Sequence, residues 1–159
     1  MTESTTKPNR PLYKHELYFA YGSNLNKAQF FRRCPNARCF GRFTMPDWRL
    51  VFDRVADIVP APGEAVEGAL YEITRKCERA LDRYEGFPHL YVKEKFKVIY
   101  TGQRGRRIER DAMVYVMWSE SLCQPSDFYA NTIRTGFDDW GIPHDTLDAA
   151  LAEVRREAA

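Results

Sequence analysis

The patterned part of the chain begins with a short apolar run that ends in a small polar turn. Residues 17–21 are large or apolar, as in a buried strand, and Gly22, Ser23 and Asn24 follow directly. Glycine allows a close backbone approach, and Asn24 or Asn26 can cap a helix that begins there. Because a turn between strand and helix leaves backbone N–H groups unpaired, the stretch predicts either an anion-binding loop or a plain connection.

The next part of the chain alternates between short helical and extended patterns. A short helix is predicted at 26–33, where apolar side chains lie on one side and a proline follows. Short strands are predicted at 37–43, 48–53 and 56–59. The segment 60–63 consists of proline, alanine and glycine and predicts a protruding loop. These patterns indicate a sheet with a turn-rich excursion.

A strand and a helix with clear ends follow. Residues 66–73 predict a strand, and Gly68 within it indicates a bulge, a bend or a crowded backbone approach. Residues 75–85 repeat apolar side chains at the i, i+3, i+4 and i+7 spacing, which is typical of a helix with one buried stripe. Thr74 is the predicted N-cap of this helix and Gly86 its terminator.

The last part of the chain predicts a hairpin and two helices. Residues 91–101 alternate charged and apolar side chains, 102–107 form a loop rich in glycine and arginine, and 111–118 return as a buried strand. Helices are predicted at 126–140 and 146–156. Many strands with hairpin connections and a few helices indicate an α+β protein with a mostly antiparallel sheet that can close on itself.

Length and composition predict one domain with a short leading tail. The chain has 159 residues, and 44% of them are hydrophobic, which suffices for a sizeable core. Residues 1–14 are polar and without periodicity, so we expect a disordered or loosely attached tail before a domain at 15–159. No apolar run approaches the roughly 20 residues that span a bilayer, and the N-terminus does not resemble a signal peptide. We therefore expect a cytoplasmic protein without a membrane partner.

The charge balance favours a small-molecule partner. The 24 basic and 22 acidic residues nearly cancel, so nothing electrostatic requires nucleic acid. The cluster Arg104, Arg106 and Arg107 could contact phosphate, although a solvated hairpin tip explains it more simply. A nucleic-acid binder that used this cluster with Arg32 and Arg33 would show strongly salt-dependent binding. We expect no nucleic-acid partner and a monomer or a homodimer.

The cysteines and histidines give no local motif for thiol or metal chemistry. The four cysteines are scattered, without a Cys-x-x-Cys pair or a nearby histidine at zinc spacing: Cys34, Cys39, Cys77 and Cys123. We interpret them as free thiols, mostly buried. A catalytic cysteine would need a histidine partner, and no local feature marks one among the three histidines: His15, His89 and His144. We therefore expect neither a metal nor a cofactor.

Glu85 is the candidate for proton transfer. It is the last residue of the helix that Gly86 ends, and it follows Leu81 by one turn, at the margin of the buried stripe. The negative end of the helix dipole and partial burial both disfavour the anion, so both raise its pKa. A carboxylate with a raised pKa suits general acid/base catalysis near neutral pH. The alternative is an exposed glutamate paired with a neighbouring lysine or arginine.

Four motifs in order resemble those of one enzyme family. They are residues 21–25 (Tyr-Gly-Ser-Asn-Leu), 66–71 (Val-Glu-Gly-Ala-Leu-Tyr), 81–86 (Leu-Asp-Arg-Tyr-Glu-Gly) followed by Tyr91, and the closing helix and turn within 125–143. Together they resemble the gamma-glutamylcyclotransferase (AIG2-like) family over about residues 16 to 143. Each motif alone is weak, but four in register are specific.

The resemblance implies both a fold and a site. The implied fold is a small mixed, mostly antiparallel β-barrel with flanking helices. The family's acid/base glutamate falls on Glu85. The implied substrate-binding residues are the opening loop, which holds the α-carboxylate and amino end of a γ-glutamyl substrate, and two pocket tyrosines: Tyr21, Gly22, Ser23, Asn24, Leu25, Tyr91 and Tyr129. For Tyr91 and Tyr129, ordinary aromatic packing is the alternative.

The implied reaction needs no cofactor. The α-amine of a γ-glutamyl compound attacks its own γ-carbonyl, closes the lactam 5-oxoproline and expels an amine or amino acid, with Glu85 as base and then acid. Such an enzyme is classed as an acyltransferase or a lyase. Within the family the leaving group can be an amino acid, a γ-glutamyl-lysine amine or part of a protected antibiotic precursor. A non-catalytic small-molecule-binding or stress-response module is the rival interpretation, and the presence of Glu85 disfavours it.

Overall fold

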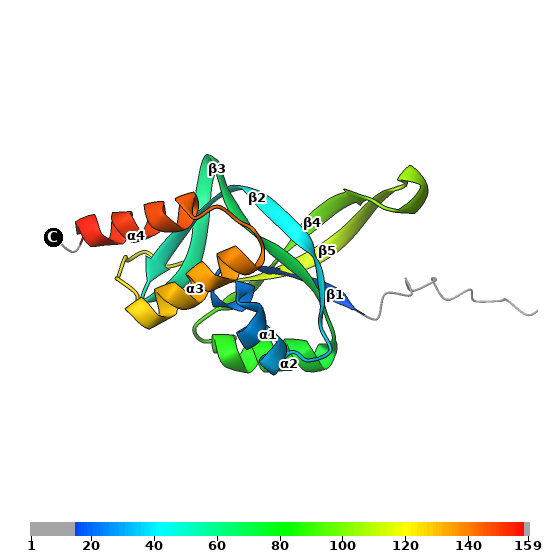
Figure 1. The fold of residues 1–159 in the computed structure, drawn as a ribbon, viewed down its shortest axis with the longest axis horizontal. Coiled ribbons are helices and arrows are strands. Elements are labelled where there is room, and N and C mark those ends of the chain that lie inside the picture. The colour runs from blue at the N-terminus through cyan, green and yellow to red at the C-terminus, as the bar shows by residue number, and fades with distance from the viewer. Residues whose placement is uncertain (1–14, 158–159) are drawn as a thin grey trace, which may run out of the picture.

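A computed structural model describes residues 15–157, so the predicted tail at 1–14 lies outside the described residues. Within this range the chain forms strands, helices and two short 3₁₀ turns (Figure 1). In chain order they are β1 (Glu16–Ala20), η1 (Ser23–Leu25), α1 (Lys27–Arg33), β2 (Arg38–Asp53), β3 (Val55–Ile73), α2 (Arg75–Glu85), β4 (Val92–Thr101), η2 (Gln103–Gly105), β5 (Arg107–Val116), α3 (Asp127–Asp139) and α4 (Asp145–Glu157).

The sheet confirms the predicted α+β class. Its strand order is β2-β3-β1-β5-β4, and every neighbouring pair is antiparallel except β1 and β5. Among residues 15–157 the edge strands β2 and β4 share no backbone ladder, so the sheet is not a closed barrel. The two edges meet instead through aromatic rings, with Phe43 and Phe96 at 5.7 Å and Phe40 and Tyr100 at 5.0 Å between centroids. The edges therefore approach each other through side chains alone.

The prediction of a protruding loop at 60–63 was wrong, because strand β3 continues through these residues. The ladder between β2 and β3 passes from the pair Trp48–Pro60 to the pair Pro46–Ala65, which leaves extra β3 residues as a bulge. The backbone N–H of Gly63 donates to the Asp47 carboxylate at 3.0 Å within this bulge. A proline is tolerated at such an irregularity, so it did not end the strand.

Helix α2 confirms the predicted caps. The Thr74 hydroxyl accepts a hydrogen bond from the Cys77 backbone N–H at 3.2 Å, as an N-cap does. Gly86 adopts the left-handed conformation, with φ of 63°, and ends the helix. The helix therefore terminates immediately after Glu85, which fixes where that side chain leaves the helix.

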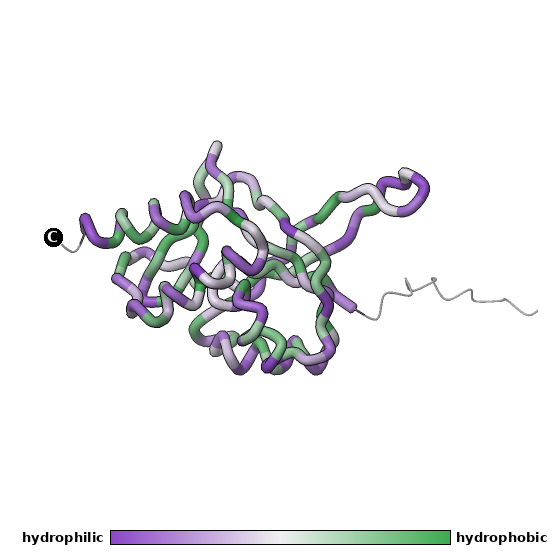
Figure 2. Tube along the Cα trace, in the orientation of Figure 1, coloured by the Kyte–Doolittle hydropathy of each residue, from purple (hydrophilic) through white to green (hydrophobic). Residues whose placement is uncertain are grey.

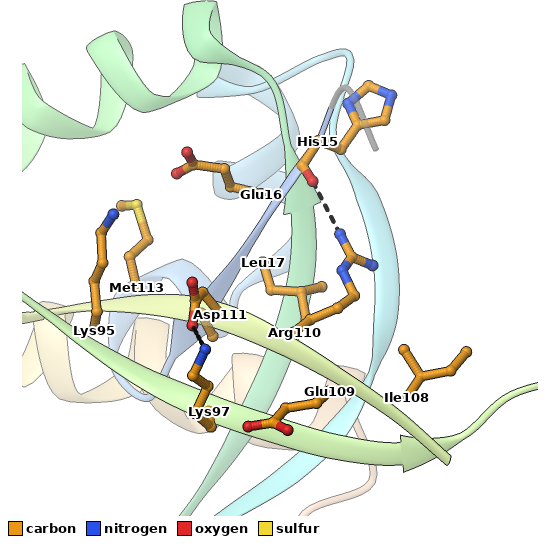
Figure 3. Close-up of a pocket in the computed structure, with 11 residues that line it drawn as sticks. His15, Glu16, Leu17, Lys95, Lys97, Ile108, Glu109, Arg110, Asp111 and Met113 are labelled. Atoms are coloured by element: carbon orange, nitrogen blue, oxygen red, sulfur yellow. Dashed lines mark hydrogen bonds and ion pairs between the residues drawn. The ribbon is translucent and has the colours of Figure 1, made fainter. Parts of the chain in front are cut away.

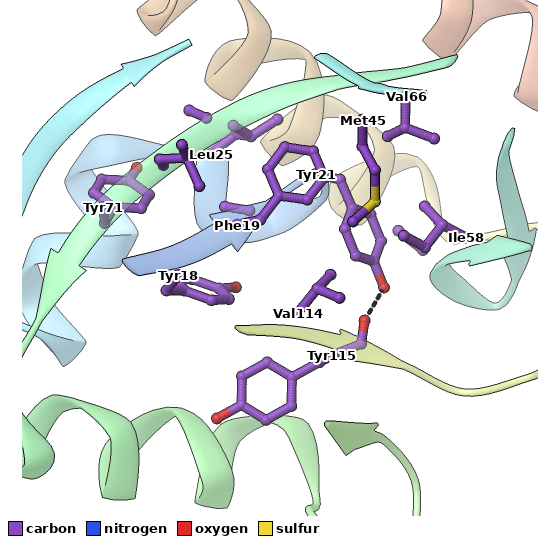
Figure 4. Packing of buried hydrophobic residues seen from close by; sticks show 14 of the residues in the cluster. Tyr18, Phe19, Tyr21, Leu25, Met45, Ile58, Val66, Tyr71, Val114 and Tyr115 are labelled. Carbon is purple, nitrogen blue, oxygen red and sulfur yellow. Dashed lines mark hydrogen bonds between the residues drawn. The ribbon is translucent and has the colours of Figure 1, made fainter. Parts of the chain in front are cut away.

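The core lies around β1, the central strand of the sheet. The side chains of Leu17 and Phe19 are fully buried, and Tyr71 of β3 stacks on Phe30 of α1 at 3.7 Å between ring centroids. Figure 4 shows Phe19 and Tyr71 among the buried side chains of this core. Hydrophilic residues gather at the tip of the hairpin between β4 and β5, which projects from the body (Figures 1 and 2). This placement agrees with the prediction that the arginine cluster is a solvated tip. No helix of the described range is long and apolar enough to cross a membrane.

The cysteine interpretation was wrong. Cys34, at the end of α1, forms a disulfide with Cys77 in the first turn of α2, across a sequence separation of 43 residues. The two free cysteines, Cys39 and Cys123, are exposed rather than buried. The pairing follows from the packing of α1 against α2, which brings the two Cα atoms to 4.9 Å, and no local spacing motif announces it.

We predict that Gly68→Ala lowers the free energy of unfolding by about 1–3 kcal/mol or more. A Cβ atom there would lie 2.2 Å from the Ala20 carbonyl oxygen and 2.7 Å from the Phe19 ring, so β1 and β3 would have to separate. Gly41→Ala is the matched strand control, because its Cβ would meet nothing within 4 Å. Urea denaturation measures both variants, and equal midpoints would contradict the prediction.

Candidate functional site

One small cavity brings together most of the residues that the sequence singled out. Its lining comes from the end of β1, the η1 turn, the end of α2, β5 and α3: Tyr18, Tyr21, Gly22, Ser23, Asn24, Glu85, Tyr91, Tyr115 and Tyr129. Seven of the eight predicted site residues are in this set. Leu25 is the exception, because its side chain is fully buried in the core beside Gly136. Glu85 therefore faces the loop across a shared cavity.

Close backbone packing holds the loop in place. A Cβ on Gly136 of α3 would lie 2.6 Å from the Asn26 nitrogen and 2.7 Å from the Leu25 carbonyl carbon, so only glycine allows α3 to pack on η1. A Cβ on Gly22 would similarly lie 3.0 Å from the Ala56 side chain of β3. The Asn26 side chain accepts from the Gln29 N–H at 3.1 Å and caps α1, as predicted. The turn is thus fixed between α1, α3 and β3.

The side chain of Asn24 connects the loop to Glu85. Its amide nitrogen donates to a Glu85 carboxylate oxygen at 3.1 Å and to the Tyr18 hydroxyl at 3.0 Å. Its backbone carbonyl accepts from the Tyr71 hydroxyl at 2.8 Å. Asn24 is 2% exposed, so these bonds satisfy a polar residue in the interior. The loop therefore positions the carboxyl group directly.

Glu85 has the raised pKa that its place in the sequence predicted. Burial raises the pKa of its carboxyl group to about 7, and the Arg33 guanidinium acts in the opposite direction. Such a carboxyl group is about half protonated at neutral pH, so it can both take up and release a proton there. Among the described residues Asn24 donates one hydrogen bond to this carboxyl group, which leaves acceptor capacity for a ligand.

The tyrosines form the sides of the cavity, and the hydroxyl groups of three of them are hydrogen-bonded to the backbone. The Tyr91 hydroxyl donates to the Ala56 carbonyl at 2.6 Å, and the Tyr129 hydroxyl accepts from the Ala56 N–H at 3.0 Å. The Tyr21 hydroxyl donates to the Tyr115 carbonyl at 2.6 Å (Figure 4). Burial raises the pKa of every tyrosine that lines the cavity, so these hydroxyl groups stay neutral: Tyr18, Tyr21, Tyr91, Tyr115 and Tyr129.

Sequence reasoning missed four residues of the site. Tyr18 and Tyr115 line the cavity, and Arg33 and Tyr84 lie at its edge. The Arg33 guanidinium donates to the side-chain oxygen of Asn24 at 2.8 Å. The Tyr84 hydroxyl lies 2.9 Å from the Ser23 hydroxyl. Tyr84 directly precedes Glu85, so its position in the motif was a usable signal. No feature of the sequence identifies Arg33, because an arginine at a helix end has the pattern of an ordinary solvated residue.

A larger cavity elsewhere lacks these features. It has a volume of about 350 Å³ and lies between the start of β1 and the hairpin of β4 and β5 (Figure 3). Lys97 and Asp111 form an ion pair at 2.6 Å there, and Arg110 donates to the His15 carbonyl at 2.9 Å. It contains none of the predicted site residues. The cavity beside Glu85 is therefore the candidate active site.

The fold and the site define a small α+β protein in which a partly buried glutamate faces a Tyr-Gly-Ser-Asn turn. The family model described as gamma-glutamyl cyclotransferase, AIG2-like, matches residues 18–135. A gamma-glutamylcyclotransferase of Homo sapiens is 30% identical over 140 residues, which cover 80% of this chain and 72% of that protein. The corresponding protein of Bos taurus is 29% identical with the same coverage.

Solved structures agree with the sequence relatives. One described as a gamma-glutamyl cyclotransferase has a TM-score of 0.68 and 27% identity, and the match covers 87% of both chains. This chain belongs to the gamma-glutamyl cyclotransferase, AIG2-like family. The membership confirms the predicted family and, at that level, a cyclotransferase enzyme.

We predict that Glu85→Gln becomes more stable than the wild type as the pH rises. The pKa of Glu85 is about 7 in the folded protein and near its ordinary value of 4.5 when exposed. The folded state therefore binds the proton more tightly, and this stabilisation, present below the unfolded pKa, is lost as the pH rises through about 7. Glutamine mimics the protonated form and keeps its stability.

Urea denaturation at about pH 5 and about pH 8 measures the effect. Between these two pH values the unfolding free energy of the variant should rise by about 1–3 kcal/mol relative to that of the wild type. A difference in unfolding free energy that does not change with pH would contradict the raised pKa.

Proposed function

We propose that this protein is a gamma-glutamylcyclotransferase that releases 5-oxoproline from a γ-glutamyl amine or amino acid, with Glu85 as general acid and base. One observation carries the proposal: the Glu85 carboxyl group, with a pKa of about 7, shares a cavity with the loop at residues 21–24. The names of the relatives support the same activity. We further propose that the protein acts in the cytoplasm on a small-molecule substrate.

The two sides of the cavity suit the two charges of a γ-glutamyl head group. The first N–H groups of a helical turn have no partner within it, so the start of η1 offers donors to an α-carboxylate. The Glu85 carboxylate, opposite, accepts hydrogen bonds from an α-ammonium. Binding both ends folds the flexible chain so that its nitrogen approaches its own γ-carbonyl carbon.

The proposed reaction proceeds through one tetrahedral intermediate. Glu85 takes a proton from the α-ammonium, and the free amine attacks the γ-carbonyl carbon to close a five-membered ring. The intermediate collapses when the protonated Glu85 returns the proton to the departing nitrogen and the original amide C–N bond breaks. The ring nitrogen gives up its remaining extra proton, by way of Glu85, to the departing amine, which leaves as an ammonium. The products are 5-oxoproline and a free amine or amino acid, and Glu85 regains its starting charge. Loop N–H groups are the proposed donors to the transient oxyanion.

The cavity is narrow, so substrate binding requires movement at its rim. Its volume is about 20 Å³, which is room for roughly one water molecule and far too little for a γ-glutamyl head group. Tyr84 is the rim side chain with most freedom, because it is 42% exposed. We propose that Tyr84 lies across the entrance and moves away from Ser23 when a substrate enters; their hydroxyl groups now lie 2.9 Å apart.

We expect the purified protein to release 5-oxoproline from at least one member of a panel of γ-glutamyl amino acids and γ-glutamyl amines. Glu85→Gln should lower kcat by about 10²–10⁴-fold, the usual contribution of a general acid/base group. Quantification of 5-oxoproline by mass spectrometry measures both. Because the variant should fold at least as stably as the wild type at neutral pH, its loss of activity would not reflect unfolding.

Glu64→Gln is the matched control. Its carboxylate is 58% exposed, lies on β3 and contacts Arg49 only at 3.8 Å, so its turnover should equal that of the wild type. Absence of product from the whole panel, or wild-type turnover by Glu85→Gln, would refute the proposed enzyme. Substrate binding without turnover would favour the rival small-molecule-binding module.

A further inference from the structure

Arg33 contacts the site from outside the cavity. It is the last residue of α1, and the next residue, Cys34, is tied by the disulfide to Cys77 of α2. The Arg33 guanidinium donates to the side-chain oxygen of Asn24 at 2.8 Å and to that of Gln29 at 3.3 Å. A short helix is thus held at its end, directly beside the residue that reaches toward Glu85.

The first contact determines which way the Asn24 amide points. An asparagine side chain has a donor end and an acceptor end, and a rotation of half a turn exchanges them. Because Arg33 is only a donor, it requires the Asn24 oxygen on its side, which leaves the amide nitrogen to face Glu85. In the opposite orientation two acceptors would confront each other across 3.1 Å when Glu85 is ionised. Arg33 therefore selects the orientation that supports the carboxylate.

The second contact involves the rim of the cavity. The Arg33 guanidinium lies over the Tyr84 ring, at 3.5 Å from the centroid, in the stacked geometry that planar guanidinium groups favour. Tyr84 in turn contacts Ser23 of the loop through its hydroxyl. One cation therefore contacts both Asn24, which donates to Glu85, and Tyr84, which lies at the edge of the cavity.

Arg33 is also the cation that acts on the charge of Glu85. The groups that face Glu85 from β1, from the residue after β1, from the residue before β4, and from β5 and α3 are tyrosine hydroxyls, which burial keeps neutral: Tyr18, Tyr21, Tyr91, Tyr115 and Tyr129. The Tyr84 hydroxyl precedes it on α2, and two further carboxyl groups lie nearby. Asp57 of β3 accepts from backbone N–H groups at 2.8 and 3.0 Å, and Asp82 of α2 pairs with Lys93 of β4 at 2.8 Å. Among these described neighbours, Arg33 alone offsets the effect of burial.

We propose that Arg33 is a positioning residue that keeps Glu85 available as a base by fixing the Asn24 amide and by placing a positive charge behind it. The proposal rests on the proposed function of the site. In it, Arg33 never touches the substrate. It acts on Glu85 through the hydrogen bond to Asn24 and through the electrostatic effect of its positive charge. Its stack on Tyr84 makes movement of Tyr84 at the edge of the cavity depend on the same side chain.

The test is the pH dependence of kcat/KM for 5-oxoproline release by Arg33→Met, Arg33→Lys and the wild type. The ascending limb, which reports deprotonation of Glu85, should move to higher pH by about 0.5–1 unit in Arg33→Met, because burial is no longer opposed. At about pH 7 kcat/KM should fall about tenfold. Arg33→Lys should restore the position of the limb but not the full rate, because lysine keeps the charge and loses the planar stack.

Arg32→Met is the matched control, because it removes an equal charge from the neighbouring position of the same helix. Its pH profile should coincide with that of the wild type. An Arg33→Met profile that is lower but unshifted, or an equal shift in Arg32→Met, would overturn the proposal.

A measurement that needs no turnover separates this proposal from the proposed reaction. In the Arg33→Met background, the advantage of Glu85→Gln over its parent in unfolding free energy should stop growing at a higher pH than in the wild-type background, because that pH marks the folded-state pKa of Glu85. If the wild type releases no 5-oxoproline but this shift is observed, the reaction is wrong and the role of Arg33 stands. If 5-oxoproline is released but the shift is absent, the role of Arg33 is wrong.

Discussion

The site depends on the hydrogen bonds of one buried asparagine. Asn24 donates to Glu85 and to Tyr18, and it accepts from Arg33 and from Tyr71. These four partners come from α2, β1, α1 and β3. A buried polar network is stabilising only when its members are satisfied, so a change at any of these contacts reaches the carboxyl group. The proposed acid/base role of Glu85 therefore depends on the hydrogen bonds that Asn24 needs because the loop buries it.

The ionised Glu85 carboxyl group lowers the stability of the folded protein in the position where the fold holds it. Glu85 ends a helix at the negative pole of its dipole and lies among buried tyrosines, and burial raises its pKa to about 7. The surrounding structure imposes this position by close backbone contacts, notably between α3 and η1 at Gly136 and between β1 and β3 at Gly68. A group that opposes folding when ionised, yet is held rigidly, is typical of a site shaped for function rather than for stability.

Local signals in the sequence were sufficient for most elements, and together with the family resemblance they identified seven of the nine residues that line the cavity. Helix α2 was predicted with its caps because Thr74, the apolar stripe and Gly86 act within one segment. The turn after β1 and the glutamate at the end of α2 were identified for the same reason. The continuation of β3 through Pro60 was missed, since the pairing with β2 overrides the local preference for a loop.

Features that arise from tertiary packing could not be found in the same way. The disulfide joins residues 43 positions apart, and only the packing of α1 on α2 brings them together. Arg33 has the composition and position of a surface residue, and its role depends on contacts with Asn24 and Tyr84. The closing of the sheet edges through aromatic rings likewise depends on curvature that a residue pattern does not encode.

The central claim is that the Glu85 carboxyl group titrates near neutral pH, and its pKa can be measured directly. Carbon-13 NMR of the δ-carbons of labelled glutamates, recorded from about pH 4 to about pH 9, would follow each carboxyl group, with Glu85→Gln used to assign the signal. The structure predicts a midpoint of about 7 for Glu85. A midpoint near the ordinary value of 4.5 would contradict the account.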